Sequence, residues 1–231
     1  KSHRPGDTGI GKTLEDLLDV KENNIQAPDL HGFEIKSMRQ LSSSNLTLFT
    51  KSPNPKGSNN RLRISYGSED ETFPDLRVLH TTLKNGWNTH TKGKVNYSYC
   101  LKLDNNLNRV NFLVKKLEDD EILENGEVYI NYETIEEKIK NKINNLAFVS
   151  TSSEKKDGVE YFEFNSCTLY SGITINNFLK LVNDGLIVYE FRIGSYKNPT
   201  KNNFGKIHDH GSGFRINPRN LSKLYKEELI I

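Results

Sequence analysis

Two carboxylates and a lysine lie close together early in this sequence. Asp29 is followed by Glu34 and Lys36 in the stretch Pro-Asp-Leu-His-Gly-Phe-Glu-Ile-Lys. If residues 32–38 form a strand, as their alternation predicts, Glu34 and Lys36 share one face and Asp29 enters from the preceding turn. Two carboxylates suit Mg²⁺, and a neighbouring ammonium can orient a water molecule for phosphodiester hydrolysis. On spacing alone, a surface turn and a strand with one salt bridge is the commoner explanation.

A second pattern precedes these residues. Residues 6–13 read Gly-Asp-Thr-Gly-Ile-Gly-Lys-Thr and satisfy the phosphate-binding expression GxxxxGK[ST]. A P-loop follows a buried strand and works with a later acid that completes a magnesium site. Here residues 1–5 are polar, and Glu190 is only a weak match for that acid. Nucleotide hydrolysis is therefore the alternative function, whereas the simpler role of the glycines is close approach of the backbone to a neighbouring segment.

Charge is distributed unevenly along the chain. The formal net charge is +2, but residues 118–137 contain nine acids and no Lys or Arg, so the remainder is strongly basic. Residues 194–223 carry six bases against one acid, interleaved with Gly, Asn and aromatics. Such a segment suits a DNA backbone, whose neutralisation supplies much of the affinity of DNA-binding proteins. A solvated lysine-rich loop has the same composition.

The hydrophobic pattern predicts a mixed α/β protein. Expected helices cover residues 13–20, with Thr13 as N-cap, then 73–83, 134–144 and 175–182, and a last one opens at Asn217-Pro218. Expected strands cover residues 32–38, 46–50, 95–103, 110–117, 127–132, 146–150, 159–164, 186–193 and 213–216. The first two strands are expected to form a hairpin, and residues 186–193, apolar on both faces, a central strand.

Composition limits the class of protein. With 231 residues, 34% hydrophobic and 10% aromatic, the chain suits one large domain or two closely packed lobes and is not disordered throughout. It contains no run of the roughly 18 to 20 apolar residues that a membrane span needs, and no signal-type stretch, so we expect a cytoplasmic protein without membrane association. Cys100 and Cys167 lie far apart, which predicts neither a disulfide framework nor a cysteine-rich metal site.

Several segments carry a family resemblance. The run Gly-Ile-Gly-Lys-Thr-Leu-Glu at residues 9–15, with Glu-Asn-Asn at 22–24, Pro-Asp at 28–29 and Phe-Glu-Ile-Lys-Ser-Met-Arg at 33–39, resembles the MvaI/BcnI type of restriction endonucleases. Residues 46–51 and the late stretch His-Asp-His-Gly-Ser-Gly-Phe-Arg-Ile at 208–216 are similar to later parts of that family's sequences. The glycines of residues 9–13 belong to the same pattern, which makes the P-loop match a coincidence.

The resemblance implies a fold and an organisation. The family belongs to the PD-(D/E)XK nucleases and is related to the mismatch-repair nicking enzyme MutH. We therefore expect an α/β fold, a mixed sheet flanked by helices, with two lobes around a DNA cleft. A single endonuclease domain over residues 1–231 would contain a catalytic motif region at 9–51 and a DNA-recognition loop region at 194–216.

The resemblance also implies an activity. It predicts a type II site-specific deoxyribonuclease that uses Mg²⁺ to hydrolyse double-stranded DNA at a short, nearly palindromic site and leaves 5′-phosphates. Such an enzyme is expected to act as a monomer and to have a cognate DNA methyltransferase as its genetic partner. Asp29, Glu34 and Lys36 would occupy the catalytic positions, with Asp29 and Glu34 as metal ligands, and Glu15 would be the helical acid beside the metal.

Binding of DNA is assigned to a wider set of side chains. The predicted contacts are Arg39, Arg192, Lys201, Lys206, His208, Asp209, His210 and Arg215. Arg215 is the leading guanine reader, because a bidentate arginine is the commonest specific base contact, and Gly211 and Gly213 are expected to permit close approach to the duplex. Besides the P-loop NTPase, a MutH-like protein that nicks DNA or only binds it is the alternative function.

Overall fold

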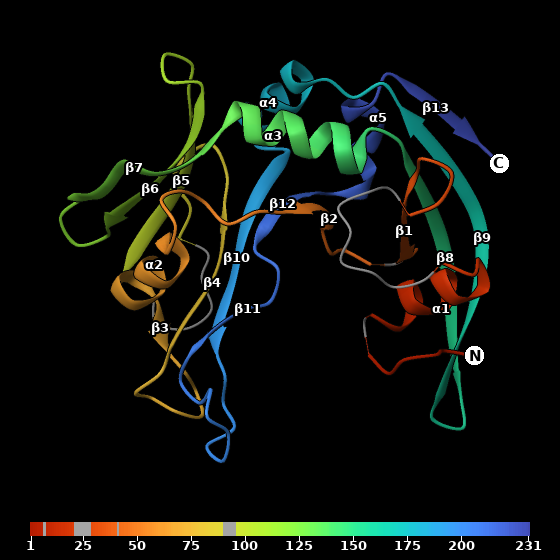
Figure 1. Cartoon of the computed structure of the whole chain (residues 1–231), viewed down its shortest axis with the longest axis horizontal. Coiled ribbons are helices and arrows are strands. Elements are labelled where there is room, and N and C mark those ends of the chain that lie inside the picture. The colour runs from red at the N-terminus through yellow and green to blue at the C-terminus, as the bar shows by residue number, and fades with distance from the viewer. Residues whose placement is uncertain (7, 21–28, 41, 90–95) are drawn as a thin grey trace. The chain divides into compact units, whose positions relative to one another are not determined.

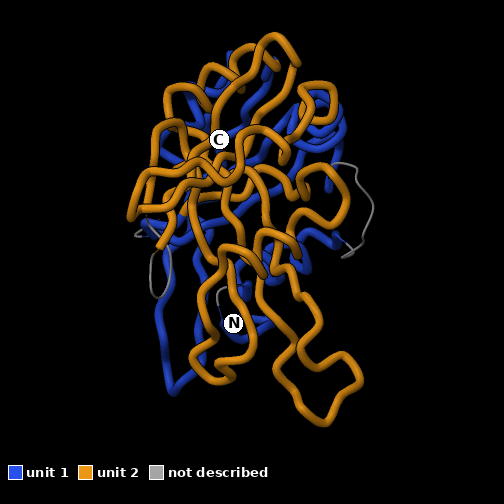
Figure 2. Tube along the Cα trace, turned by 90° about the vertical axis from the view of Figure 1, so that its left-hand side faces the viewer, with its two compact units in different colours: residues 1–44, 136–174, 218–231 blue, residues 45–135, 175–217 orange. Residues whose placement is uncertain are grey.

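The computed structural model describes residues 1–6, 8–20, 29–40, 42–89 and 96–231, and Figure 1 shows the course of the chain. It divides into two compact units, which Figure 2 distinguishes by colour. Unit 1 contains residues 1–44, 136–174 and 218–231, and unit 2 contains residues 45–135 and 175–217. Neither unit is a continuous stretch of sequence, so each brings together segments that are distant along the chain.

Unit 1 is built on a four-stranded sheet in the order β1-β8-β9-β13 (Figure 1). Its strands are β1 (Glu34–Arg39), β8 (Leu146–Lys156), β9 (Val159–Ser171) and β13 (Glu227–Ile230). β1 is an edge strand and pairs in parallel with β8, with Glu34 opposite Leu146, whereas the other pairs are antiparallel. Leu14 of helix α1 (Gly9–Leu17) packs with Ile35 and Val149, which fixes α1 against the first two strands.

Helix α1 begins four residues earlier than the sequence predicts. Thr13 is therefore not an N-cap but lies inside the helix, where its hydroxyl donates to the Gly9 carbonyl (2.7 Å) and accepts from the His3 amide (2.9 Å). A Cβ at Gly9 would stand 2.2 Å from the Arg4 carbonyl oxygen, so only glycine permits this packing of α1 on the N-terminal segment. Leu17 is 64% exposed, contrary to the expected apolar face.

Unit 2 contains two further sheets. The larger has the order β2-β12-β10-β4-β3, with β11 also pairing β10, and the smaller is the antiparallel meander β5-β6-β7. Their bounds are β2 (Leu46–Thr50), β3 (Ser68–Glu69), β4 (Arg77–Leu83), β5 (Tyr97–Asp104), β6 (Arg109–Lys116), β7 (Ile122–Asn131), β10 (Ile187–Ser195), β11 (Ile207–Asp209) and β12 (Gly213–Ile216). Phe49, Phe178, Tyr189 and Phe214 are fully buried between the larger sheet and helix α4 (Ile175–Asn183), and their rings contact one another.

Most predicted elements are confirmed, including the meander, the central strand β10 and helix α4. The helix predicted over residues 73–83 is wrong: β4 covers its second half, and Leu79, Thr81 and Leu83 are buried while the residues between them are more exposed, which is the period of a strand. The predicted hairpin of β1 and β2 is also wrong, because β2 pairs with β12.

The remaining helical segments are short. They are α2 (Ser58–Tyr66), α3 (Tyr132–Lys138), a π-helix η1 (Ile139–Ile143), a 3₁₀ turn η2 (Pro218–Asn220) and α5 (Leu221–Leu224). α2 lies in a stretch for which the sequence predicts no helix. The expected C-terminal helix consists only of η2 and α5, and β13 follows it. In the described part of the chain, no helix is long and apolar enough to cross a membrane.

Candidate functional site

A tight turn positions Asp29 beside the first strand of unit 1. The Leu30 and Phe33 backbones are hydrogen-bonded to each other across the turn (3.1 and 2.8 Å), and His31 and Gly32 between them have positive φ angles. The Asp29 Oδ2 atom accepts a hydrogen bond from the Ile35 amide at 2.9 Å. This contact brings Asp29 to the start of β1, next to Glu34, as the sequence predicts.

Glu34 is almost completely buried, with 1% of its surface exposed. Its Oε1 atom accepts from the Lys36 ammonium, which is two residues further along the same strand face. The Lys142 ammonium lies 3.4 Å from the same oxygen. The other oxygen, Oε2, is buried and accepts no hydrogen bond from the residues that the structure describes. One side of the carboxylate is thus held by two cations, while the other side has no hydrogen-bond partner among the described residues.

Lys142 is a site residue that the sequence reasoning missed. It belongs to the π-helix η1, which directly precedes β8, the parallel partner of β1. π-helical segments are rare and often occur at functional sites, but the residues that form one look like an ordinary amphipathic helix in sequence. Tyr225 of unit 1 also lies near Glu34. Its hydroxyl donates a hydrogen bond to the Ile143 carbonyl at 2.9 Å. Burial raises the pKa of this hydroxyl, and the Glu34 carboxylate raises it further.

The remaining predicted residues of unit 1 have clear positions. Glu15 is half-buried on α1, next to Leu14, which packs on Ile35 of β1. Arg39, at the far end of β1, forms a bidentate pair with Glu160 of β9 at 2.9 and 3.0 Å. Arg39 is therefore part of the framework of the sheet as well as a candidate contact for DNA.

The P-loop pattern does not form a nucleotide site here. Gly9, Gly11 and Lys12 lie inside α1, and the Lys12 ammonium pairs with Asp16 at 2.7 Å. The Thr13 hydroxyl, which would bind magnesium in a P-loop, is 3% exposed and uses its hydrogen bonds within the protein. The residues that would hold phosphates and metal are thus already occupied by the packing of the helix.

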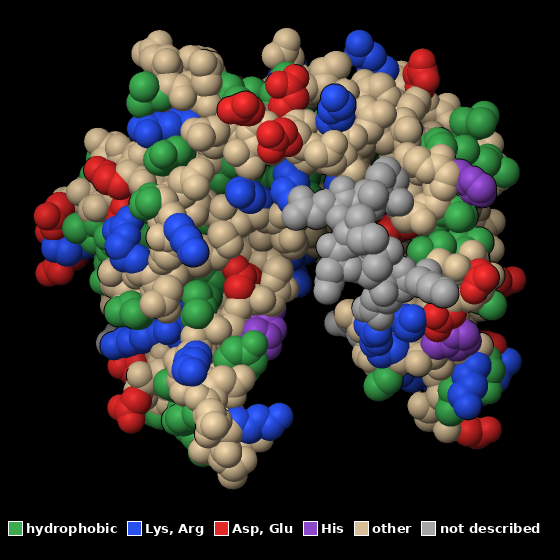
Figure 3. All heavy atoms as spheres, in the orientation of Figure 1, with side chains coloured by type: hydrophobic (Ala, Val, Ile, Leu, Met, Phe, Trp, Pro, Cys, Tyr) green, Lys and Arg blue, Asp and Glu red, His purple; other side chains and the backbone are tan. Residues whose placement is uncertain are grey.

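The predicted recognition segment lies in unit 2, where β11 extends the pairing of β10 with Gly194 opposite His208. Figure 3 shows basic side chains and a histidine over this part of unit 2. The Asp209 carboxylate accepts from the Asn59 side chain (2.6 Å) and from the Gly211 and Ser212 amides (3.0 and 2.7 Å). Asp209 is thereby committed to shaping the turn between β11 and β12.

Three ring contacts organise the surface of this segment. Tyr196 stacks on His208 with centroids 4.2 Å apart, and His208 lies 4.0 Å from His210. The ring of His80, from β4, meets His210 edge-on at 6.5 Å. Burial, followed by the nearby His208, lowers the pKa of His210. This shift favours the neutral ring of His210, which can offer both a donor and an acceptor.

The two predicted arginines of this segment have different environments. The Arg215 side chain is 6% exposed; its guanidinium donates to Thr47 Oγ1 and to the Gly211 carbonyl (2.9 Å) and pairs with Glu190 at 2.9 Å. Arg192 pairs with the same Glu190 at 3.1 Å, but 48% of its side chain is exposed. Burial lowers the pKa of Arg215. Arg192, and not Arg215, presents an accessible guanidinium on this surface.

The two predicted lysines lie in the loop between β10 and β11. Lys201 and Lys206 are exposed and line a shallow hollow with Thr200, Asn202 and Asn203. Lys197 pairs at 2.6 Å with the buried carboxylate of Asp70, and Phe204 packs edge-on against Phe73 at 5.3 Å. These two contacts hold the loop in place and thereby fix the backbone that carries Lys201 and Lys206.

Gly213 has a role other than the expected approach to DNA. A Cβ at this position would stand 2.2 Å from the Phe49 carbonyl oxygen and 2.7 Å from the Thr50 Cα atom. Only glycine therefore lets β12 pair this closely with β2. Gly211, by contrast, has a φ of +94°, so it is the turn between β11 and β12 that requires glycine there.

In the described part of the chain, the start of β1 thus combines a buried carboxylate that has one oxygen without a hydrogen bond, a second carboxylate from the preceding turn and two lysines, a set of groups that can serve phosphate-ester hydrolysis. Comparison with known proteins identifies the class more closely. The family model of the MvaI/BcnI restriction endonucleases matches residues 1–225. The chain belongs to this family and is a type II site-specific endonuclease.

Solved structures support the same conclusion. The structure described as a complex of restriction endonuclease MvaI with its cognate DNA substrate has 34% sequence identity and a TM-score of 0.89, covering 100% of this chain and 90% of that one. The structure of MvaI in the absence of DNA has 35% identity and a TM-score of 0.65, covering 99% and 90%. The mixed α/β fold is shared with MvaI. Among curated proteins, no sequence matches this chain significantly.

Proposed function

We propose that this enzyme hydrolyses double-stranded DNA at a short, nearly palindromic sequence, with Mg²⁺ as cofactor and a 5′-phosphate and 3′-hydroxyl as products. The observation that carries the proposal is the buried Glu34 carboxylate, which has Lys36 on one oxygen and, within the described ranges, no hydrogen-bond partner on the other. The DNA-bound structure of the similar protein MvaI supports DNA as the substrate. The chain is expected to act as a monomer beside a cognate DNA methyltransferase.

The carboxylates of unit 1 fit a divalent cation. A buried anionic oxygen without a hydrogen bond costs free energy unless a cation meets it, and Glu34 Oε2 is such an atom. Asp29 is fixed at the start of the same strand through its hydrogen bond with the Ile35 amide. Two carboxylates with room for water match Mg²⁺, which keeps several waters and needs few protein ligands. We assign Asp29 and Glu34 as its ligands and Glu15 as the neighbouring acid. When bound, Mg²⁺ would supply a water of lowered pKa and neutralise charge on the phosphoryl oxygens.

The two lysines have distinct roles in this proposal. Lys36 shares the strand face of Glu34, so its ammonium can orient the attacking water and hold the carboxylate at the same time. Lys142 approaches Glu34 from η1, a different element of unit 1, and restricts the rotation of the carboxylate. With both cations on Oε1, Oε2 is directed to the remaining side. The site is thereby organised before DNA arrives.

We assign base recognition to the exposed groups of the β10 to β12 segment. Arg192 and His210 have accessible polar atoms, and His208 is fixed between Tyr196 and His210. Lys201 and Lys206 would neutralise backbone phosphates. Asp209 and Arg215 would position these residues without contacting DNA, because the side chains of Asp209 and Arg215 are hydrogen-bonded within the protein. This division separates residues that contact DNA from residues that position them.

Digestion of a sequenced plasmid, followed by mapping of the fragment ends, tests the proposal. We expect discrete fragments with 5′-phosphates, cleavage that stops in EDTA, and full-length linear DNA when a plasmid has one site. A plasmid that only relaxes to the open circle would support the MutH-like nicking alternative instead. Fragments without fixed ends would contradict site-specific cleavage.

A further inference from the structure

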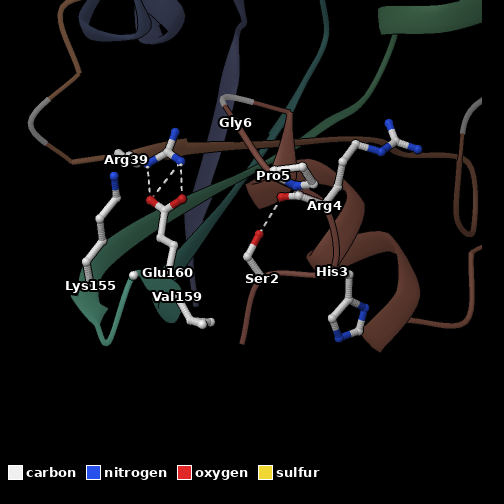
Figure 4. A pocket seen from close by; sticks show the side chains of 10 residues that line it. Ser2, His3, Arg4, Pro5, Gly6, Arg39, Lys155, Val159 and Glu160 are labelled. Carbon is white, nitrogen blue, oxygen red and sulfur yellow. Dashed lines mark hydrogen bonds and ion pairs between the residues drawn. The ribbon is translucent and has the colours of Figure 1, made fainter.

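The two faces of β1 have different surroundings in unit 1. Glu34 and Lys36 share one face of the strand, whereas Arg39, an odd number of residues after Glu34, lies on the other. Figure 4 shows the Arg39 guanidinium beside the Glu160 carboxylate, at a cavity that the N-terminal segment also lines. The groups that hold the Glu34 carboxylate therefore come from a different part of unit 1.

The segment at the end of η1 contacts the start of β1 at three points. The Lys142 ammonium lies 3.4 Å from Oε1 of Glu34. The Asn145 carbonyl accepts a hydrogen bond from the Glu34 amide at 3.0 Å. The Asn145 side-chain amide donates to the Gly32 carbonyl at 3.2 Å, in the turn that follows Asp29. The position of this segment therefore affects the side chain and the backbone of Glu34 and the turn beside it.

The end of η1 is itself held by Tyr225. The last carbonyls of a helix have no donor within the helix, and Ile143 is the last residue of η1. The Tyr225 hydroxyl donates to the Ile143 carbonyl at 2.9 Å, and both residues are buried. Figure 1 shows α5, which Tyr225 directly follows, next to the end of the helix that begins with α3. Tyr225 thus links the C-terminal segment to the residue next to Lys142.

Tyr225 is firmly held on its own side of this contact. Its ring packs against Tyr170 of β9 with centroids 5.4 Å apart. The backbone around it is hydrogen-bonded as well, from the Tyr225 amide to the Leu221 carbonyl (3.2 Å) and from the Lys226 amide to the Ser171 carbonyl (3.1 Å). A hydroxyl that is fixed in this way restricts the movement of the η1 backbone.

We propose that Tyr225 is a positioning residue for DNA cleavage, whose hydroxyl holds the end of η1 so that Lys142 stays on one oxygen of Glu34 and the other oxygen remains directed to the cation. The inference rests on the proposed function, in which Glu34 is a metal ligand. Tyr225 contacts neither the cation nor DNA in this scheme and acts only through η1. Its effect on cleavage must therefore depend on Lys142.

The experiment uses the full chain with Tyr225→Phe, Lys142→Ala and the double variant. Tyr225→Phe removes one hydroxyl and keeps the ring that packs on Tyr170. Tyr99→Phe is the matched control, because Tyr99 of unit 2 is also buried and its hydroxyl also donates to a backbone carbonyl, that of Tyr66, at 2.9 Å. The rate measured is single-turnover cleavage of a mapped site, with saturating enzyme and Mg²⁺.

Tyr225→Phe should lower this rate severalfold, by less than the about 10- to 100-fold expected of Lys142→Ala. In the Lys142→Ala background it should cause no further loss, because substitutions that remove the same contact are not additive. Tyr99→Phe should cleave at the wild-type rate. If Tyr225→Phe lowers the rate by the same factor with and without Lys142, Tyr225 has only a structural role and the inference is wrong. A wild-type rate in Tyr225→Phe would also overturn it.

Amide hydrogen exchange of the free enzyme, without metal or DNA, provides a second measurement. Tyr225→Phe should speed exchange at residues 142–146 and at the Glu34 amide, which donates to Asn145, whereas Tyr99→Phe should leave these amides unchanged. Unchanged exchange in Tyr225→Phe would show that the hydroxyl does not hold η1, and faster exchange throughout unit 1 would indicate a general loss of stability; either result would refute the inference. Failure of the proposed function is distinguishable, because the wild-type enzyme would then not cleave DNA in Mg²⁺, whereas the exchange measurement does not require cleavage.

Discussion

Replacement of Arg215 should destabilise the fold rather than selectively remove base recognition. Its side chain is 6% exposed and pairs with Glu190, which is 14% exposed. Removing one partner of a buried ion pair costs about 3 to 5 kcal/mol, because the other charge stays buried. Glu190 keeps Arg192 at 3.1 Å and the Asn45 amide at 3.4 Å. We therefore expect the lower end, about 3 kcal/mol, for Arg215→Ala, which corresponds to a fall in Tm of about 6 to 12 °C for a chain of this size.

The matched variant is Arg192→Ala, which removes the exposed guanidinium from the same carboxylate. Its free energy of unfolding should change by no more than about 0.5 kcal/mol, as is usual for surface positions. Its affinity for cognate DNA should fall by about 1 to 3 kcal/mol, without a matching loss on scrambled DNA. Thermal unfolding and titration of both variants test this. An Arg215→Ala protein that unfolds like the wild-type enzyme, yet loses only cognate binding, would refute the reasoning and make Arg215 the base reader.

Three further substitutions separate the roles in unit 1. Asp29→Asn keeps the hydrogen bond with the Ile35 amide but removes the charge, so this variant should fold normally and lose cleavage in Mg²⁺. In the wild-type enzyme Mn²⁺ should replace Mg²⁺, whereas Ca²⁺ should not, because the looser coordination of Ca²⁺ positions water less well. Robust cleavage in EDTA would be incompatible with a metal site. Lys142→Ala should lower the single-turnover cleavage rate about 10- to 100-fold, as is found for groups that orient a ligating carboxylate. Lys140 is exposed on the same π-helix, so Lys140→Ala is the control and should leave this rate unchanged. Equal rates for the two variants would show that Lys142 does not belong to the site. Lys12→Ala should leave thermal unfolding in the presence of ATP unchanged, since no nucleotide is bound, and a saturable ATP complex would revive the P-loop function.

Much of the fold could be predicted from local patterns. The apolar run at β10 predicted a buried strand, and the alternating pattern of the meander follows from the two-residue period of strands. Asp29, Glu34 and Lys36 could be placed together because the same period puts Glu34 and Lys36 on one face. The assignment of β4 failed because its Thr and Leu residues fit a helical period as well. The pairing of β1 with β8 could not be predicted, since about 100 residues separate them.

At the site, too, the sequence could not predict contacts between residues that are distant along the chain. Lys142 lies more than a hundred residues after Glu34, and only the parallel pairing of β8 with β1 brings them together. Arg215 looked accessible because it lies in a basic segment, but Glu190 and Thr47, which enclose it, come from other strands. Charge and spacing identify residues that can do chemistry, whereas burial decides which of them face a ligand.

In the proposed mechanism, Glu34 serves the phosphate chemistry and not the recognition of DNA. The most direct test is Glu34→Gln, which keeps the size of this buried side chain while removing its charge. Cleavage of a mapped cognate site and binding of the same duplex should be measured side by side. Binding by the wild-type enzyme is measured in Ca²⁺, in which we expect no cleavage. We predict that Glu34→Gln binds the cognate duplex with nearly unchanged specificity and does not cut it. A folded Glu34→Gln enzyme that still cleaves at the wild-type rate would contradict the assignment of the catalytic centre.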